Sequence, residues 1–153
     1  TETGVTVQKM VYELDAGAIL GTKKEPIDIS DTTTTLRARL IEKGATLLME
    51  VLPPFLEGVL TPTAQVHELA TYAKKIRKED GELSRTDDAL TNWNKYRAYI
   101  EWPGTYFFTE RKGVTIRVKI TDAKLTPEKE FRILRVIPEG KKEMDYTTFL
   151  QST

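Results

Sequence analysis

The carboxylate of Asp15 is the strongest candidate for catalytic chemistry in this sequence. It stands between a β-branched, alternating segment and a tight turn, with Leu14 before it and Ala16-Gly17 after it. A carboxylate that such a turn half-buries can orient a neighbouring histidine or raise the pKa of that histidine, which is a role in proton transfer. On composition alone, an ordinary aspartate on a surface turn is the favoured interpretation.

A basic run in the second half of the chain is the candidate for binding a polyanion. Its cations are Lys74, Lys75, Arg77 and Lys78. With the apolar Ile76 among them, these cations could follow a strand edge and face phosphates. The acidic pair Glu79-Asp80 follows at once, so a surface segment that neutralises its own charge is the alternative.

The segment 102–107, Trp-Pro-Gly-Thr-Tyr-Phe, is rich in aromatic residues. Such clusters usually fill a core, because aromatic side chains bury a large apolar area. Stacking of nucleic-acid bases on these rings is the alternative.

Other kinds of site lack the residues that they need. The single histidine, His67, precedes Glu68, but Thr71 stands where a zinc-binding helix would carry a second histidine, so we expect no metal site. Gly17 and Gly21 lack the spacing of a phosphate-binding loop. Cysteine is absent, which excludes disulfides and cysteine nucleophiles. No apolar run approaches the roughly 18 residues of a membrane span.

The charges divide unevenly along the 153 residues, although the net charge is zero. Residues 1–60 hold six Lys/Arg against nine Asp/Glu, whereas residues 61–153 hold seventeen against fourteen. A basic second half is where we expect a polyanionic partner. The sequence starts at Thr1 rather than at a methionine, which indicates part of a longer protein.

The elements that must position Asp15 are strands. Residues Gly4–Met10 alternate valine with polar residues, which predicts a strand. After the turn at Asp15-Ala16-Gly17, a short strand is expected to begin at Ala18–Leu20, and Pro26–Ile29 is expected to be extended.

A long helix should follow. Ser30-Asp31-Thr32 can cap its first turn. Its apolar face consists of Leu36, Leu40, Leu47, Leu48, Val51 and Leu52. Gly44 is unfavourable in a helix, so a packing reason for it is expected. We expect Pro53-Pro54 to perturb the helix and Gly58 to end it.

The second half of the chain predicts a small, mostly β domain. A short strand is expected at Tyr72–Arg77, and a helix at Asp87–Tyr99, capped by Asp87 or Thr86. Gly113 indicates a hairpin turn. The remaining strands are expected at Gly104–Glu110, Gly113–Lys124 and Phe131–Ile137.

The first sixty residues also resemble a known family. Thr3-Gly4-Val5-Thr6-Val7, Met10, Leu14-Asp15-Ala16-Gly17, Pro26-Ile27 and the helix entry at Asp31-Thr32 occur in order. This series is similar to the second half of the catalytic domain of folate-dependent formyltransferases, in which T-G-V-T is followed by a loop that ends in L-D-x-G.

The remainder resembles one branch of that family. Residues Ala70–Gly81 resemble the opening of the carboxy-terminal domain of methionyl-tRNA formyltransferases. Arg97-Ala98-Tyr99 and Trp102-Pro103-Gly104 match the R-A-F…P-W-P-G segment of that domain, and Pro138–Lys142 with Phe149-Leu150 resembles its closing strand and tail.

The resemblance implies an enzyme, cytoplasmic in bacteria or organellar, that moves the formyl group of 10-formyltetrahydrofolate onto methionyl-initiator tRNA. The catalytic groups of the family are an asparagine, a histidine two residues later, and an aspartate that corresponds to Asp15. Asn-x-His does not occur in these 153 residues, so we expect the chain alone to be inactive. The pteridine would contact Tyr12, Glu13, Leu14 and Asp15. The tRNA would contact Lys74, Lys75, Arg77 and Lys78.

By the same resemblance, the fold is mixed α+β. Residues 1–60 would be the carboxy-terminal part of the formyltransferase catalytic domain, a partial, Rossmann-like α/β segment. Residues 61–70 would be a linker, and residues 71–153 a small OB-like β-barrel with one helix that binds tRNA. The amino-terminal half of the catalytic domain would be a partner, and residues 1–60 could also self-associate.

The chain departs from the family pattern at three places. Glu13 replaces a small residue, Glu101 replaces the usual proline, and the region between Lys124 and Phe131 is shorter than in most relatives.

Two alternative functions remain open. The chain could be a portion of a sugar-nucleotide N-formyltransferase, or it could be a stand-alone, non-catalytic tRNA-binding module. The basic run favours tRNA over a nucleotide sugar, which needs no extended row of cations.

Overall fold

The computed structural model describes residues 2–84 and 86–152, and it divides the chain into two compact units. The first unit is Thr1–Lys74 and the second is Lys75–Thr153. Across the described residues, the helices are too short or too polar to cross a membrane. The fold is mixed α/β, with one antiparallel sheet in each unit.

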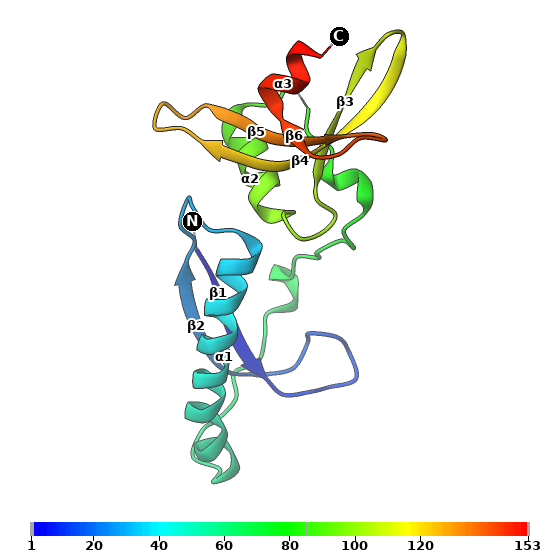
Figure 1. Ribbon diagram of the computed structural model, residues 1–153. Coiled ribbons are helices and arrows are strands. Elements are labelled where there is room, and N and C mark those ends of the chain that lie inside the picture. Colours follow the sequence, from blue (N-terminus) through cyan, green and yellow to red (C-terminus); the bar gives the residue numbers. More distant parts are fainter. Residues whose placement is uncertain (1, 85, 153) are drawn as a thin grey trace. The chain divides into compact units, whose positions relative to one another are not determined.

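The first unit is a hairpin with a helix against it (Figure 1). Strand β1 (Glu2–Gln8) pairs antiparallel with β2 (Ile19–Pro26), and α1 (Thr33–Leu56) contacts both strands. Alternate β1 residues, Val5 among them, are half-buried, as expected for a strand with one face on a helix. The predicted strand at Gly4–Met10 is therefore confirmed, and the second strand is longer than expected. The Rossmann-like character of this unit stays a prediction, because its one recorded ladder is antiparallel.

The start of α1 follows from local capping. Thr32 is the N-cap: its hydroxyl accepts from the Thr35 amide, and its own amide donates to the Thr35 hydroxyl. Of the predicted apolar face, Leu47 and Val51 are buried, whereas Leu48 and Leu52 are exposed. The helix therefore packs on the hairpin with a narrower stripe than the sequence predicts.

The two prolines that were expected to perturb α1 lie inside its last turns. The helix continues through Pro53 and Pro54 to Leu56. A proline removes one amide donor and crowds the carbonyl four residues earlier, but here only the last turn bears that cost. The expected stop at Gly58 is confirmed, since this glycine has φ +72° just after the helix.

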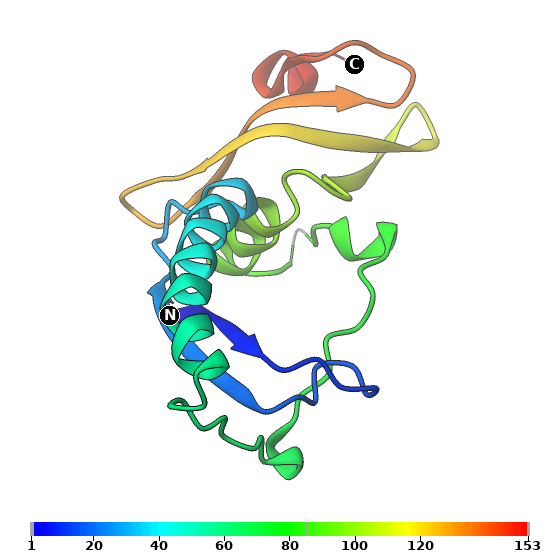
Figure 2. The ribbon, with the colours of Figure 1, turned by 90° about the horizontal axis from the view of Figure 1, so that it is seen from below.

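The second unit is built on a four-stranded antiparallel sheet. Figure 2 shows its long strands β4 (Val114–Leu125) and β5 (Phe131–Pro138). The order is β3-β4-β5-β6, with β3 at Thr105–Arg111 and β6 at Met144–Asp145. The three predicted strands are confirmed to within one residue at each end. The β3–β4 turn at Lys112-Gly113 is confirmed too: both residues have positive φ, +50° and +76°, as a two-residue hairpin loop needs.

Three expectations for this part of the chain were wrong. Tyr72–Arg77 is not a strand, because no strand of the described residues pairs with it. Short 3-10 turns lie on either side of it, at His67–Leu69 and Lys78–Gly81. The N-cap of α2 (Ala89–Ala98) is Asp88, whose carboxylate accepts from the amides of Leu90 and Thr91.

The third error concerns the number of helices. A second helix, α3 (Tyr146–Gln151), follows β6 and contacts β5. The family tail therefore closes on the sheet as a helix and not only as a strand. The recorded strand order is that of an open meander, so closure into an OB-like barrel stays a prediction.

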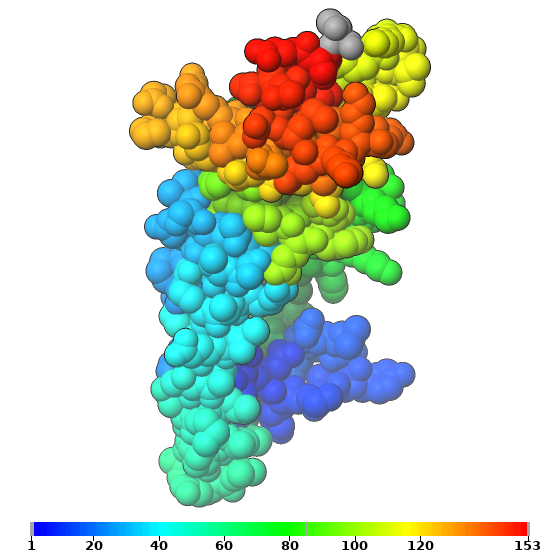
Figure 3. Space-filling model, in the orientation of Figure 1, coloured from blue at the N-terminus to red at the C-terminus, as the bar shows by residue number. Residues whose placement is uncertain are grey.

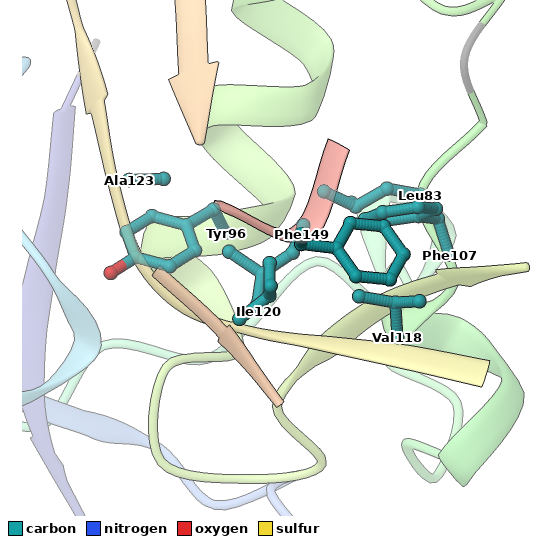
Figure 4. Close-up of a cluster of buried hydrophobic side chains, with 8 residues drawn as sticks. Leu83, Tyr96, Phe107, Val118, Ile120, Ala123 and Phe149 are labelled. Carbon is teal, nitrogen blue, oxygen red and sulfur yellow. The ribbon is translucent and has the colours of Figure 1, made fainter. Parts of the chain in front are cut away.

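The second unit has an apolar core of its own, drawn in Figure 4. Its buried members come from both helices, from three strands and, for Leu83, from the segment before α2: Leu83, Tyr96, Phe107, Val118, Ile120, Ala123, Val136 and Phe149. Phe107 thus fills core, as the first interpretation of the aromatic segment required. Trp102 does not, because 53% of its surface is exposed.

Candidate functional site

Asp15 lies in an exposed loop, residues 9–18, that joins β1 to β2. The structure leaves Asp15 exposed and holds it at φ +54°, a left-handed conformation that aspartate tolerates better than most residues. Tyr12 and Leu14 are almost fully exposed, and the loop protrudes from the first unit in Figure 3. The half-buried carboxylate that the sequence raised as a possibility is therefore wrong for the described chain, and the exposure of Asp15 is that of an ordinary aspartate on a surface turn.

The loop is nevertheless held in place, and Gln65 holds it. The Gln65 side-chain amide Nε2 donates to the carbonyl oxygens of Asp15, at 2.8 Å, and of Gly17, at 2.7 Å. It also reaches Gln8 Oε1, at 3.0 Å, and Gln8 Nε2 in turn lies 3.5 Å from Asp15 Oδ1. The backbone of Asp15 is therefore fixed although its carboxylate faces solvent.

Two further contacts fix the ends of this loop. Thr63 forms an antiparallel bridge with Ile19, with backbone hydrogen bonds of 2.7 and 2.8 Å. A Cβ at Gly17 would lie 1.7 Å from the carbonyl oxygen of Lys9, so only glycine fits there. This close approach is the physical reason for the glycine in the L-D-x-G pattern.

Gln65 was not among the predicted site residues, since residues 61–70 were expected to be only a linker. The segment contacts the hairpin through Thr63 and Gln65. No local pattern signals a contact between residues about fifty positions apart, so the sequence offered no sign of it. The division into residues 1–60, 61–70 and 71–153 stays a prediction.

A charged cluster fixes the start of α1 against β2. Arg39 donates to both carboxylate oxygens of Asp31, at 2.6 and 2.7 Å, and to Glu25, at 2.8 Å. Lys43 also pairs with Glu25. Asp31 and Glu25 are both buried. The two hydrogen bonds from Arg39 hold the pKa of Asp31 well below its usual range, and those from Lys43 and Arg39 lower the pKa of Glu25.

The predicted tRNA-binding cations are all exposed. Lys74, Lys75, Arg77 and Lys78 make no ion pair with a residue that the structure describes. Asp80 instead accepts a hydrogen bond from the backbone amide of Arg77, at 2.7 Å. The alternative, a solvated surface segment that Glu79 and Asp80 neutralise, needs no direct ion pair, so both interpretations of the basic run stay predictions.

The candidate residues are divided between the two units. Asp15 belongs to the first unit, and three of the four cations belong to the second. His67 is exposed in its 3-10 turn. Within the described ranges, no group of three His, Cys, Asp or Glu side chains is arranged to hold a metal ion.

Two family models match the chain in order along the sequence. "Formyl transferase" matches residues 1–52, which carry the β1–β2 hairpin, its loop and most of α1. "Formyl transferase, C-terminal domain" matches residues 75–132, from the basic run into β5. A methionyl-tRNA formyltransferase of Listeria innocua is 34% identical over 98% of the chain. The chain belongs to the formyltransferase family.

The chain spans about half the length of this relative, 54% of it. Solved structures of other formyltransferase-fold proteins agree in fold. HypX from Aquifex aeolicus, solved in complex with tetrahydrofolic acid, gives a TM-score of 0.67 at 18% identity over 97% of this chain and 30% of HypX. An N-formyltransferase from Helicobacter canadensis was solved in complex with folinic acid and dTDP-3-aminofucose. It gives a TM-score of 0.65 at 20% identity, over 82% of this chain and 45% of the N-formyltransferase chain.

Proposed function

We propose that this chain is part of a methionyl-tRNA formyltransferase, which transfers a formyl group from 10-formyltetrahydrofolate to methionyl-initiator tRNA. The observation that carries the proposal is the 34% identity to a methionyl-tRNA formyltransferase over 98% of the chain. Both family models, matched in order, support it. Such an enzyme would act in the bacterial cytoplasm or in an organelle.

Asp15 is the proposed catalytic carboxylate. Its role would be to orient the family's histidine and to help manage the proton that the attacking amine loses. That histidine and its asparagine would come from polypeptide outside these residues, because no Asn-x-His occurs in the 153. The hydrogen bonds from Gln65 to the loop support this role, since a positioning carboxylate needs a fixed backbone.

The loop before Asp15 is the proposed folate contact. Tyr12 and Leu14 present exposed apolar surface beside the carboxylate, which fits one wall for a flat pteridine ring. Glu13 would lie at the rim. The pocket would be completed by the amino-terminal half of the catalytic domain, so we expect only weak binding of 10-formyltetrahydrofolate, and no formyl transfer, by the 153 residues alone.

The basic run is the proposed tRNA contact, and its salt dependence is the test. Four exposed cations that displace counterions from phosphates should give a log–log salt slope of about −2 to −4 for binding of initiator tRNA. Replacing Lys74 and Lys75 by alanine should flatten that slope by about 1–2 and weaken binding of all tRNAs alike.

Lys141 and Lys142 offer the matched control. They are adjacent and exposed like the first pair, and their replacement by alanine removes the same charge. The control should leave the slope nearly unchanged. An affinity independent of salt, or equal effects of the two double substitutions, would refute tRNA binding through this run.

An exposed apolar surface of the first unit is a further proposed binding site. The helix α1 and the residues after it expose large apolar side chains that a catalytic domain would cover: Ile41, Leu48, Met49, Leu52, Leu56 and Val59. We propose that this surface binds the amino-terminal half of the catalytic domain, or a second copy of the chain when that half is absent.

A further inference from the structure

A basic pocket of about 240 Å³ lies on the second unit, and all of its lining residues belong to that unit. Three cationic side chains line it: Lys78 from the 3-10 turn, and Arg117 and Lys119 from β4. Among the described residues that line it there is no carboxylate. The other lining residues are Trp102, Pro103, Gly104, Thr105 and Tyr106.

The fold brings these cations together from positions about forty residues apart. Arg117 and Lys119 alternate along β4 and share one face, while Val118 between them is fully buried on the other. The 3-10 turn that carries Lys78 lies close to the start of β3, because Gly81 packs directly against Gly104. A Cβ added at Gly81 would lie 2.1 Å from the carbonyl oxygen of Gly104. The sequence could not have signalled this convergence.

The cationic side chains that line the pocket form no direct ion pair within the described chain. Lys78 and Lys119 have none there, and the Arg117 guanidinium lies over the Tyr106 ring, 5.4 Å from its centre. Carboxylates lie nearby: Glu139 accepts from the Arg117 backbone amide, at 3.1 Å, and Glu79 and Glu82 act on Tyr106. Three like charges that converge without a direct ion pair repel one another, which favours a bound anion.

One neutral group of the pocket is suited to an oxyanion. Burial raises the pKa of Tyr106, as do the carboxylates of Glu82 and Glu79, so that this phenol stays protonated and can donate. Tyr106 pairs across the strands with Lys119 and lies on the same face of the sheet, whereas its neighbour Thr105 pairs with the buried Ile120.

At the rim, Trp102 presents an exposed ring, with 53% of its surface accessible. We propose that the pocket binds one phosphate of an RNA backbone at an unpaired nucleotide, and that the base of this nucleotide stacks on Trp102. Unpaired bases are the parts of an RNA that proteins stack on aromatic side chains. The identification of this RNA as a tRNA rests on the proposed function, whereas the pocket itself requires only single-stranded RNA.

The phosphate contact is tested with a short single-stranded RNA oligonucleotide and the full chain. Lys119→Ala should flatten the log–log salt slope of binding by about 1, because one phosphate contact is lost. Lys124→Ala is the matched control, since Lys124 lies on the same strand, is exposed, and is outside the pocket. Equal effects of the two substitutions would overturn the pocket in favour of general electrostatic attraction.

The stacking contact is tested with Trp102→Ala. Loss of one stacked base should weaken binding of the oligonucleotide roughly 5- to 100-fold. The substitution should change little when the probe is an abasic oligonucleotide of the same length. Trp102→Phe keeps a ring and should restore most of the affinity. An equal loss on normal and abasic probes, or no rescue by phenylalanine, would refute stacking.

Initiator tRNA separates this proposal from the proposed function. If tRNA binding depends on Lys74 and Lys75, and neither the tRNA nor the oligonucleotide depends on Lys119 and Trp102, the pocket proposal fails and the proposed function stands. If the oligonucleotide binds through Lys119 and Trp102 while tRNA does not bind, the proposed function fails and the pocket stands. Binding of inorganic phosphate without binding of RNA would overturn the RNA proposal.

Discussion

The stability of the first unit should depend strongly on Arg39, because this one side chain pairs with two buried carboxylates. Asp31 and Glu25 have lowered pKa values in the folded chain, from ordinary values of 3.8 and 4.5. Their ion pairs therefore stabilise the fold at pH values above these ordinary pKa values. That contribution is lost as the pH falls below about 4.5 and through the lowered pKa values of the folded state.

Arg39→Met should therefore destabilise the first unit most at neutral pH, where it leaves two buried charges with too few partners. The difference from the parent chain should shrink below pH 4, because the unfolded chain then binds protons that the ion-paired carboxylates of the folded parent do not, so the pairs stabilise the parent less. Amide exchange of β2 and α1, measured across pH, checks this. Lys24→Met breaks the exposed pair with Glu2 and should have little effect at any pH. A pH-independent loss in the Arg39 variant would contradict the assignment.

Gln65 acts on a smaller part of the chain. Gln65→Ala removes two side-chain hydrogen bonds to the backbone of the Asp15 loop, each of which contributes about 0.5–1.5 kcal/mol. Amide exchange in residues 9–18 should rise by roughly tenfold, while exchange within the β1–β2 ladder stays nearly constant. Gln8→Ala removes only side-chain contacts and should have the smaller effect. Unchanged loop exchange would show that the bridge at Thr63 suffices to hold the loop.

At the scale of elements, two glycines of the first unit should respond to alanine in opposite directions. A Cβ at Gly44 would lie 3.9 Å from Val5, which is ordinary contact, so the expected packing reason for this glycine is not there. Gly44→Ala should stabilise α1 by about 1 kcal/mol through helix propensity.

A Cβ at Gly21 would instead lie 2.8 Å from Val51 Cγ1 and 3.1 Å from Leu47 Cδ1. Both side chains are buried, so Gly21→Ala should cost about 1–3 kcal/mol by overpacking. Urea unfolding followed by far-ultraviolet circular dichroism measures both. A loss at Gly44, or no loss at Gly21, would mean that α1 packs differently on the hairpin.

At the scale of the whole molecule, the two units should differ in how they behave in solution. The second unit closes a core of its own, whereas Leu47 and Val51 are the buried apolar residues of α1. The exposed apolar side chains of the first unit gain on the order of 25 cal/mol per Å² when another surface covers them. We therefore expect the chain to self-associate through the first unit.

Light scattering at about 100 μM tests this expectation, and deletion of residues 1–65 should then yield a soluble monomer. The double substitution Met49→Ser and Leu56→Ser, at exposed positions of α1, should reduce association without removing the unit. A monomeric intact chain with strong amide protection at Val5 and Leu40 would contradict the prediction.

The sequence alone determined what depends on neighbouring residues. The Lys112-Gly113 hairpin, the capped start of α1 and the limits of β3, β4 and β5 follow from turn chemistry, capping and alternation, all of which act over a few residues. The order of the family motifs determined the family for the same reason, because a motif is read along the chain.

Only the tertiary structure decided the features that need distant partners. Tyr72–Arg77 has strand-forming residues, but a strand needs a neighbour to pair with, and no sequence window contains that neighbour. Gln65 donates hydrogen bonds to the Asp15 loop across fifty positions, and Lys78 lies beside Lys119 although they are about forty positions apart. Hydrogen bonds and charge clusters at such separations form only after the fold has brought the segments together, so the local sequence carries no sign of them.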